Sequence, residues 1–245
     1  MTETWLLEEI RRARQHRTPI PSTGTSLDLE AAYRIQQALC EGRVLRGFKL
    51  GLLSEAKQRQ MGIQEPIYGR ICADMLLERT VSLHRFVQPR LEPELATILR
   101  QDLPPGSPPG VARKAMAGWF LGLDILDSIW QDYRFTAAEV VADNASGGGF
   151  VLGEVLLGED LPETLRLYVN GALRTEGRVE ALGDPALRLC WLADRVGGLR
   201  AGQVVFLGSP AAAVPAERGV VEVAGDGKLL LVTLEGESGS GKGGV

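Results

Sequence analysis

The sequence contains little cysteine and even less histidine, and the few copies are scattered. Cys40, Cys72 and Cys190 are odd in number and have no CxxC spacing, which argues against a disulfide framework or a thiolate metal site. We expect plain thiols, buried or half-buried. His16 and His84 are too few and too far from the motifs below for a histidine metal site or a catalytic dyad. Neither a GxSxG elbow nor a dinucleotide GxGxxG occurs, so a hydrolase triad and a nicotinamide enzyme are not expected.

Long apolar runs and blocks of one charge are also missing. No stretch approaches the roughly 18 uncharged apolar residues of a membrane span, and residues 1–17 have the pattern of an amphipathic helix rather than of a secretion signal. The formal net charge is only -4, without a Lys/Arg block, so neither a nucleic acid nor a membrane is expected as a partner. We expect a cytoplasmic protein that acts on a small molecule.

What the sequence does contain is enough apolar material for a core: 44% of its 245 residues are hydrophobic. Helices are predicted over residues 3–15 and over 26–41, the second capped by Ser26, and helical patterns recur at 54–60, 111–127 and 185–196. Short apolar runs bounded by glycine and proline predict strands at 48–53, 95–99, 150–157, 165–170, 204–207, 220–223 and 229–234.

Helices and strands are segregated along the chain, which favours an α+β fold with a mixed sheet or β-roll. We expect the chain to divide into an N-terminal helical segment, residues 1–45, and a catalytic domain, residues 46–236. Residues 237–245 are rich in glycine and serine, a composition typical of a flexible tail.

The strongest local signal is the segment 88–94, QPRLEPE, which leads into an apolar run. On a strand, Glu92 and Glu94 point to the same face, and paired carboxylates favour a cation such as Mg²⁺ or Mn²⁺. The alternative is an exposed edge strand with two solvated glutamates. Asp124 stands inside the apolar segment WFLGLDILD, where a buried carboxylate requires a partner or a metal ion. Its alternative is a helix position that faces water.

Three further segments carry polar groups that could meet a ligand. Lys49 lies in the strand-like FKLGL, where it either snorkels to the surface or enters a polar cavity. Ser146 belongs to ADNASGGG, which is typical of a tight turn or of backbone close to a ligand. Gly208 and Ser209 end the run 204–207 and offer a backbone amide and a hydroxyl. For these last two segments a plain turn is the alternative.

In this order the motifs resemble those of the 2-oxopent-4-enoate hydratase and 4-oxalocrotonate decarboxylase family, within the fumarylacetoacetate hydrolase superfamily. The motifs lie at residues 47–52, 58–69, 88–94, 141–146, 182–193 and 201–209. The resemblance implies a fumarylacetoacetase-like mixed β-roll with N-terminal helices, a Mg²⁺ or Mn²⁺ ion, a homo-oligomer, and a role in the meta-cleavage breakdown of aromatic compounds.

The resemblance also assigns residues. It maps the metal ligands onto Glu92, Glu94 and Asp124, of which the third is usually a glutamate. It maps an active-site lysine onto Lys49, and it places Ser146 in the matching ADNAS motif. Ser146, Gly208 and Ser209 are accordingly our predicted substrate-binding residues.

Two positions depart from the hydratase pattern. Ile67 stands where hydratases have an aspartate implicated in proton transfer, and Ile129 stands where an arginine is common. Tyr68 and Glu65 are the nearest residues that could transfer a proton instead. We therefore expect a lyase that hydrates a 2-hydroxy-2,4-dienoate. The alternatives are a 4-oxalocrotonate-type decarboxylase and an impaired paralogue that binds 2-oxo acids and assembles with an active partner.

Overall fold

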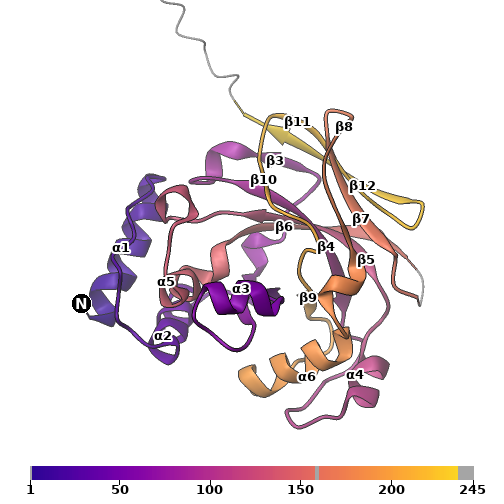
Figure 1. The fold of residues 1–245 in the computed structure, drawn as a ribbon, viewed down its shortest axis with the longest axis horizontal. Helices are drawn as coiled ribbons and strands as arrows, with labels where there is room; N and C mark the ends of the chain where they lie inside the picture. Colours follow the sequence, from indigo (N-terminus) through magenta and orange to yellow (C-terminus); the bar gives the residue numbers. More distant parts are fainter. Residues whose placement is uncertain (1, 158–159, 237–245) are drawn as a thin grey trace, which may run out of the picture.

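Two β-sheets packed face to face form the centre of the protein, seen here in a computed structural model that describes residues 2–157 and 160–236 (Figure 1). The predicted tail, 237–245, lies outside the described residues. The larger sheet has the order β2 (Ile67–Cys72), β1 (Leu45–Gly51), β9 (Val204–Phe206), β4 (Arg90–Ile98), β5 (Phe120–Leu126) and β6 (Gly147–Leu156), and β10 (Val214–Pro215) also pairs with β4. The smaller sheet has the order β3 (Thr80–Ser82), β12 (Lys228–Glu235), β11 (Gly219–Gly225), β7 (Thr164–Val169) and β8 (Ala172–Arg178).

The main core lies between the two sheets and follows from alternation along the strands. Val221 and Val223 of β11 are fully buried, whereas Val220, whose side chain points to the other face of the strand, is exposed. Leu91 and Leu95 of β4 belong to the same buried cluster. Burying one such side chain stabilises the fold by about 1.5–3 kcal/mol. The face of β4 that carries Leu91 and Leu95 therefore points into the core, and the opposite face carries the polar residues of the strand.

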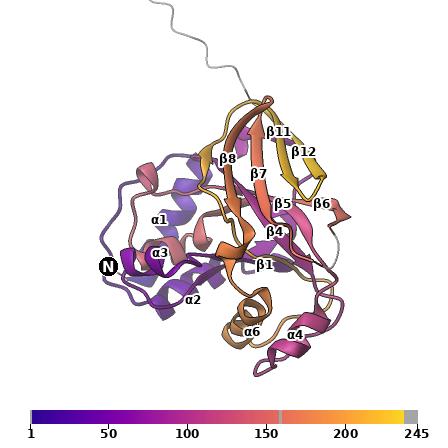
Figure 2. The same cartoon turned by 45° about the vertical axis from the view of Figure 1, so that its right-hand side comes forward.

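Helices cover the sheets in two groups (Figure 2). On one side α1 (Glu3–His16), α2 (Leu29–Leu39) and α5 (Ala137–Ala142) surround a second apolar cluster, with α3 (Glu55–Gln60) nearby. At the other end α4 (Pro109–Ala115) packs against α6 (Pro185–Val196). Five short 3-10 turns complete the described chain: η1 (Ala73–Met75), η2 (Leu83–Arg85), η3 (Gln131–Tyr133), η4 (Asn144–Ser146) and η5 (Val179–Leu182).

The α+β prediction with N-terminal helices is confirmed, and two local predictions are wrong. The helix expected over 111–127 is instead a short helix, α4, followed by strand β5. Strand β5 is hydrogen-bonded on both edges and buried, and such a strand has no polar alternation to distinguish it from a buried helix. The second helix begins after Asp28 rather than Ser26, because the Asp28 side chain accepts the amide hydrogen of Ala31.

Two other expectations concern the whole chain. Within the described residues no helix is both long and apolar enough to cross a membrane. All three cysteines are free thiols, of which Cys72 is buried and the other two are half-buried. The division at residue 45 stays a prediction. In the fold α1 packs on α2, and α2 packs on α5 of the remaining chain.

Candidate metal centre

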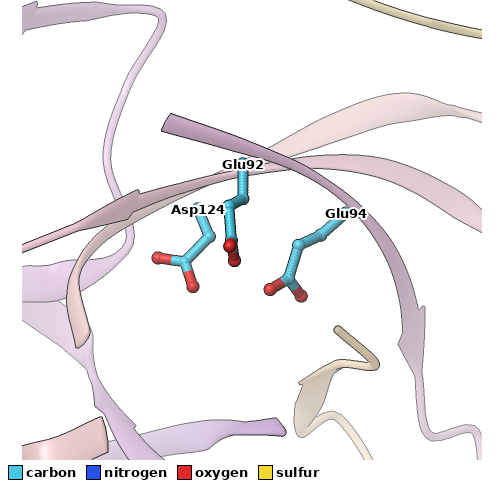
Figure 3. A group of neighbouring side chains, drawn as sticks. All are labelled: Glu92, Glu94 and Asp124. Carbon is cyan, nitrogen blue, oxygen red and sulfur yellow. The ribbon is translucent and has the colours of Figure 1, made fainter. Parts of the chain in front are cut away.

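Three carboxylates from two neighbouring strands converge at one point of the larger sheet (Figure 3). Glu92 and Glu94 alternate along β4 and point to the same face, as a strand requires. Asp124 of β5 is the register partner of Glu92 in this antiparallel pair, so its side chain emerges beside the glutamate. Carboxylate oxygens from the three residues lie within 4.8 Å of one another. We call these residues the carboxylate triad.

Lys49 of β1 brings a positive charge to the triad. Its Nζ lies 2.8 Å from Asp124 Oδ2 and donates a hydrogen bond of 3.2 Å to the carbonyl of Ala145. The lysine is almost fully buried. Burial lowers the pKa of Lys49, but the charges of Asp124, Glu94 and Glu92 outweigh this and raise the pKa above its ordinary value. Lys49 is therefore a fixed cation inside the protein, and the snorkelling alternative does not hold.

The triad itself lacks enough partners for its charge. Glu94 Oε2 accepts the amide hydrogen of Gly208 at 2.9 Å, yet Glu94 Oε1 and Asp124 Oδ1 are buried without a hydrogen-bond partner among residues 2–157 and 160–236. Burial raises the pKa of Glu92 to about 7, against the opposing charge of Lys49. Burial also raises the pKa of Glu94 and of Asp124. Simultaneous ionisation of all three carboxylates is therefore unfavourable.

A divalent cation fits this arrangement. When all three carboxylates are ionised, Lys49 compensates one charge and two negative charges remain, and unpaired buried acceptors are costly without a ligand. Carboxylate oxygens are hard donors of the kind that Mg²⁺ and Mn²⁺ prefer. The structure brings Asp124 together with Glu92 and Glu94, as the sequence predicts, and of the three only Glu92 lines the cavity described below. Glu94 and Asp124 are buried, which does not agree with a solvated edge strand or an exposed helix.

A cavity of about 320 Å³ opens beside the triad. Its polar side includes Lys49, Glu92 and Ser146, and its apolar wall includes Ile67 and Leu126. Polar groups at one end and an apolar wall along the side are typical of a pocket for a small, partly hydrocarbon ligand.

A strained turn presents two groups of the ADNAS motif to this cavity. Asn144, Ala145 and Ser146 are three consecutive non-glycine residues with positive φ, at 54°, 53° and 55°. Such conformations cost of order 1–3 kcal/mol each and persist only where the surroundings hold them. Here the Asn144 side chain bonds both backbone groups of Arg70. The turn aims the Ala145 carbonyl at Lys49 and leaves the Ser146 Oγ buried without a partner in the described chain.

Gly208 and Ser209 line the cavity but are less available than the sequence suggested. The amide of Gly208 is already donated to Glu94, so it orients a triad residue instead of meeting a ligand. A Cβ at Gly208 would approach Leu53 to 2.4 Å, and its φ is +101°, which explains the glycine. Ser209 Oγ bonds within its own turn, to the backbone of Ala211.

The two proposed proton-transfer substitutes do not line the cavity. Ile67 does line it, and Tyr68, the next residue of β2, points to the opposite face, where its ring stacks on Tyr33 at 4.3 Å. Glu65 forms an ion pair with Arg195 and accepts the Trp191 indole hydrogen at 3.2 Å. Alternation along β2 separates position 67 from position 68, so the geometry gives neither substitute a path to the ligand.

Arg90 and Tyr133 also line the cavity, and neither is among the predicted site residues. Arg90 precedes Glu92 by two residues, so the same alternation that paired the glutamates could have identified it. Tyr133 has a positive φ, as does Asp132 before it, and gives no comparable signal in the sequence.

Comparison with known proteins agrees with the geometry. The model of the fumarylacetoacetate (FAA) hydrolase C-terminal family matches residues 60–238. A 4-oxalocrotonate decarboxylase from a Pseudomonas species is 31% identical over 221 residues, which cover 83% of this chain and 85% of the relative. A 2-keto-4-pentenoate hydratase from Paraburkholderia phymatum is 34% identical over 228 residues, which cover 83% and 84% of the two chains.

A solved structure extends the likeness to the whole fold. The 4-oxalocrotonate decarboxylase of Pseudomonas putida G7, complexed with magnesium and adipate, superposes with a TM-score of 0.85 at 26% identity, covering 96% of this chain and 97% of that one. The predicted fumarylacetoacetase-like fold is confirmed by this match.

Proposed function

The chain belongs to the fumarylacetoacetate hydrolase family, and from that premise we propose that it is a metal-dependent lyase that hydrates a small 2-hydroxy-2,4-dienoate acid. Its relatives are named hydratases and decarboxylases, so an enzyme of hydro-lyase or carboxy-lyase type is the common ground. The single observation that carries the metal-dependent proposal is the buried carboxylate triad, with unpaired oxygens, at the edge of a ligand-sized cavity.

Glu92, Glu94 and Asp124 would hold the ion. Bound Mg²⁺ or Mn²⁺ would supply Lewis-acid stabilisation of the negative charge that develops on the substrate's 2-oxo oxygen. The residues of the chain supply the rest. Lys49, held between Asp124 and the Ala145 carbonyl, adds a fixed positive charge near the same oxygen. The Ser146 hydroxyl, unpaired among the described residues, can donate a hydrogen bond to the substrate carboxylate.

Hydration and decarboxylation share this charge stabilisation. In hydration, water adds to the conjugated double bond of the dienoate, and a proton moves to the neighbouring carbon. In decarboxylation, the carbon–carbon bond to a carboxylate breaks, and its electron pair enters the same conjugated system as carbon dioxide leaves. Hydration depends more strongly on a positioned acid or base, whose contribution is typically about 10²–10⁴-fold in rate.

Ile67 favours decarboxylation as the second candidate. It lines the cavity, cannot transfer a proton, and excludes water from that wall. Relatives named as hydratases, such as that of Paraburkholderia phymatum, support the first candidate. Replacing Ile67→Asp is expected to raise the rate of hydration if the remaining site is built for it. An unchanged rate of hydration in that variant, with metal binding intact, would argue against hydration and favour decarboxylation.

The deciding experiment supplies purified protein and Mg²⁺ or Mn²⁺ with 2-hydroxypenta-2,4-dienoate or 4-oxalocrotonate. Ultraviolet absorbance follows the dienol, and released carbon dioxide is measured in parallel. Loss of the dienol without gas supports hydration, and gas supports decarboxylation. No reaction with either compound at any metal concentration would overturn the lyase proposal and favour a protein that only binds such acids.

A further inference from the structure

Two of the three cysteines lie side by side, although they are far apart in the sequence. Cys40 is the C-terminal cap of α2, and Cys72 is the last residue of β2. The chain turns directly after α2, where the carbonyl of Cys40 accepts the amide hydrogen of Arg43 at 3.1 Å. Leu45, the first residue of β1, is then the register partner of Cys72. This turn therefore brings the end of α2 back to the end of β2.

The thiols of this cysteine pair interact directly. The Cys40 thiol donates its hydrogen to the sulfur of Cys72, and Cys40 packs against the apolar cluster to which Cys72 belongs. Cys72 is fully buried, whereas Cys40 is half-buried and lines a cavity along α2. A small oxidant can therefore reach the pair at Cys40, and the second sulfur lies next to the first.

The charges around the pair favour its ionisation. The hydrogen bond from Cys40 lowers the pKa of Cys72 to about 7, against the effect of burial, and the charges of Arg43 and Arg70 act in the same direction. Arg43 is itself paired with Asp74, which opposes the shift. Arg70 Nε, by contrast, is buried without a hydrogen-bond partner among the described residues, and Arg70 lines the same cavity as Cys40. An electropositive, partly accessible setting is typical of reactive cysteines.

The third cysteine has the opposite surroundings. Cys190 is a half-buried residue of α6. Burial raises its pKa, and the charges of Asp194 and Asp184 raise it further. One half-buried thiol of the chain is thus inactivated by its neighbours, and the other is coupled to a second thiol.

From these contacts we propose that Cys40 and Cys72 are a redox modification site, at which hydrogen peroxide oxidises the pair to a disulfide that joins the end of α2 to the end of β2. This inference does not depend on the proposed function, since neither cysteine lines the cavity beside the triad. The two sites meet only through β2, because the backbone of Arg70 holds the Asn144 side chain in the turn of the ADNAS motif. The disulfide fixes the end of the strand on which that turn depends.

The oxidation balances with peroxide as its only other reactant. Once the pair has lost one proton, transfer of the remaining proton along the hydrogen bond places the negative charge on Cys40. Its sulfur attacks a peroxide oxygen, the oxygen–oxygen bond breaks, and the hydroxide that leaves takes up a proton to form water, so that Cys40 becomes a sulfenic acid. The Cys72 sulfur then attacks the Cys40 sulfur, the sulfur–oxygen bond breaks, and a second water leaves with the proton of Cys72. The two thiols lose two electrons, which reduce one peroxide to two waters.

Mass spectrometry of the full chain tests the proposal. After treatment with a small excess of hydrogen peroxide at neutral pH, we expect the intact mass to fall by two hydrogen atoms. Proteolytic fragments that contain Cys40 and Cys72 should be joined until dithiothreitol separates them. The pair should be consumed about tenfold faster than Cys190, because more of it is ionised at this pH. The melting temperature should rise by about 5–10 °C, because the disulfide restricts the unfolded chain.

Three kinds of variant separate the pair from its surroundings. Cys190→Ser is the matched control and should form the same disulfide with the same gain in melting temperature. Cys40→Ser and Cys72→Ser should form no disulfide within the chain, and peroxide should not raise their melting temperature. Arg70→Gln keeps the backbone contact with Asn144 and should slow oxidation of the pair several-fold, because an unpaired cation is lost.

The opposite results are equally definite. If peroxide consumes Cys190 as fast as the pair, the surroundings of the pair do not activate it, and the proposal is overturned. Sulfinic acid on Cys40, or disulfides that form only between chains, would show that the two sulfurs cannot bond within the fold. A disulfide between Cys40 and Cys72 that lowers the melting temperature would show that the folded protein does not accommodate it, which also overturns the proposal.

Discussion

Two buried acidic clusters lie at opposite ends of the same short stretch of chain. Asp124, inside β5, belongs to the carboxylate triad, whereas Asp127, just past the end of β5, belongs to a cluster with Asp143 and Arg14. We call this second group the Arg14 cluster. Only two residues thus lie between a ligand of the candidate metal centre and a member of a set of ion pairs. Burial alone does not distinguish the two clusters, since both aspartates are almost inaccessible to solvent.

Hydrogen-bond partners do distinguish them. In the Arg14 cluster every carboxylate oxygen has a donor: Asp127 Oδ1 accepts two backbone amides at 2.8 Å, Asp143 Oδ2 accepts the amide of Ile129, and Arg14 bonds the two remaining oxygens. In the triad, Glu94 Oε1 and Asp124 Oδ1 have none among the described residues. A buried carboxylate with all its acceptors matched stabilises the fold, and one with unmatched acceptors is available for a ligand.

The largest expected effect separates the clusters by activity. Replacing Glu94→Gln keeps the shape and the acceptor for the Gly208 amide but removes one ligand charge, and we expect turnover to fall by ~10³-fold or more. Stability of the metal-free protein should not fall, because burial already raises the pKa of Glu94 well above its ordinary value. Steady-state turnover and thermal unfolding measure the two quantities, with the exposed Glu8→Gln as control. A destabilised but active variant would make the triad structural.

The next effect concerns the cation of the triad. Replacing Lys49→Met removes a fixed positive charge next to Asp124, and we expect turnover to fall by about 10²–10³-fold, comparable to the loss of one oxyanion contact. Folding should suffer less, since the neighbouring carboxylates can take up a proton in place of the lost charge. The exposed Lys114→Met provides the comparison. Equal turnover in the two variants would show that Lys49 has no part in the reaction.

The Arg14 cluster should respond in the opposite way. Replacing Arg14→Met leaves acceptors of Asp127 and Asp143 without a donor, and the free energy of unfolding is expected to fall by about 3 kcal/mol. Turnover per folded molecule should remain within a few-fold of wild type at a temperature where the variant is folded. Urea unfolding and activity at matched folded fraction are the measurements. A large loss of turnover without a loss of stability would reverse the assignment of the two clusters.

The triad was predictable from sequence, and the Arg14 cluster was not. The spacing of Glu92 and Glu94 alone predicts that they lie together, because residues two apart in a strand point to the same face in any fold. Asp124 was noticeable as an acid in an apolar run, although the segment was expected to be helical. Arg14 meets its partners across 113 and 129 residues of sequence, and no local pattern reports such a pairing.

Ile129 illustrates the same limit. Ile129 stands where the hydratase pattern commonly has arginine, so the sequence predicts a missing cation. In the fold Ile129 is fully buried in the apolar cluster beneath α1 and α5, and Arg14 of α1 provides a guanidinium to the adjacent Asp127. Which residues compensate for one another depends on packing between distant elements, and this information becomes available only with the tertiary structure.

The smallest expected effect is a difference in pH dependence. Burial raises the pKa of Glu92 to about 7 from an ordinary 4.5, so between these values the folded, metal-free protein keeps a proton that the unfolded chain has released. The folded state then binds more protons than the unfolded state, and stability must fall as the pH rises through this window. Metal binding has the opposite sign, because the ion requires the charged carboxylate.

We therefore expect Mn²⁺ affinity to weaken by about tenfold per pH unit below pH 7, while the metal-free protein becomes more stable over the same range. Calorimetry between pH 5.5 and about 8 and thermal unfolding with and without saturating Mn²⁺ measure both trends.

Asp143 has a pKa raised by burial to about 6, but it belongs to the Arg14 cluster and should titrate identically with or without the ion. In Glu92→Gln the opposing trends should both diminish while the Asp143 contribution remains. If Mn²⁺ affinity did not change with pH across this range, Glu92 would already be ionised in the metal-free protein. The surrounding residues would then stabilise the charges of the triad, as they do in the Arg14 cluster.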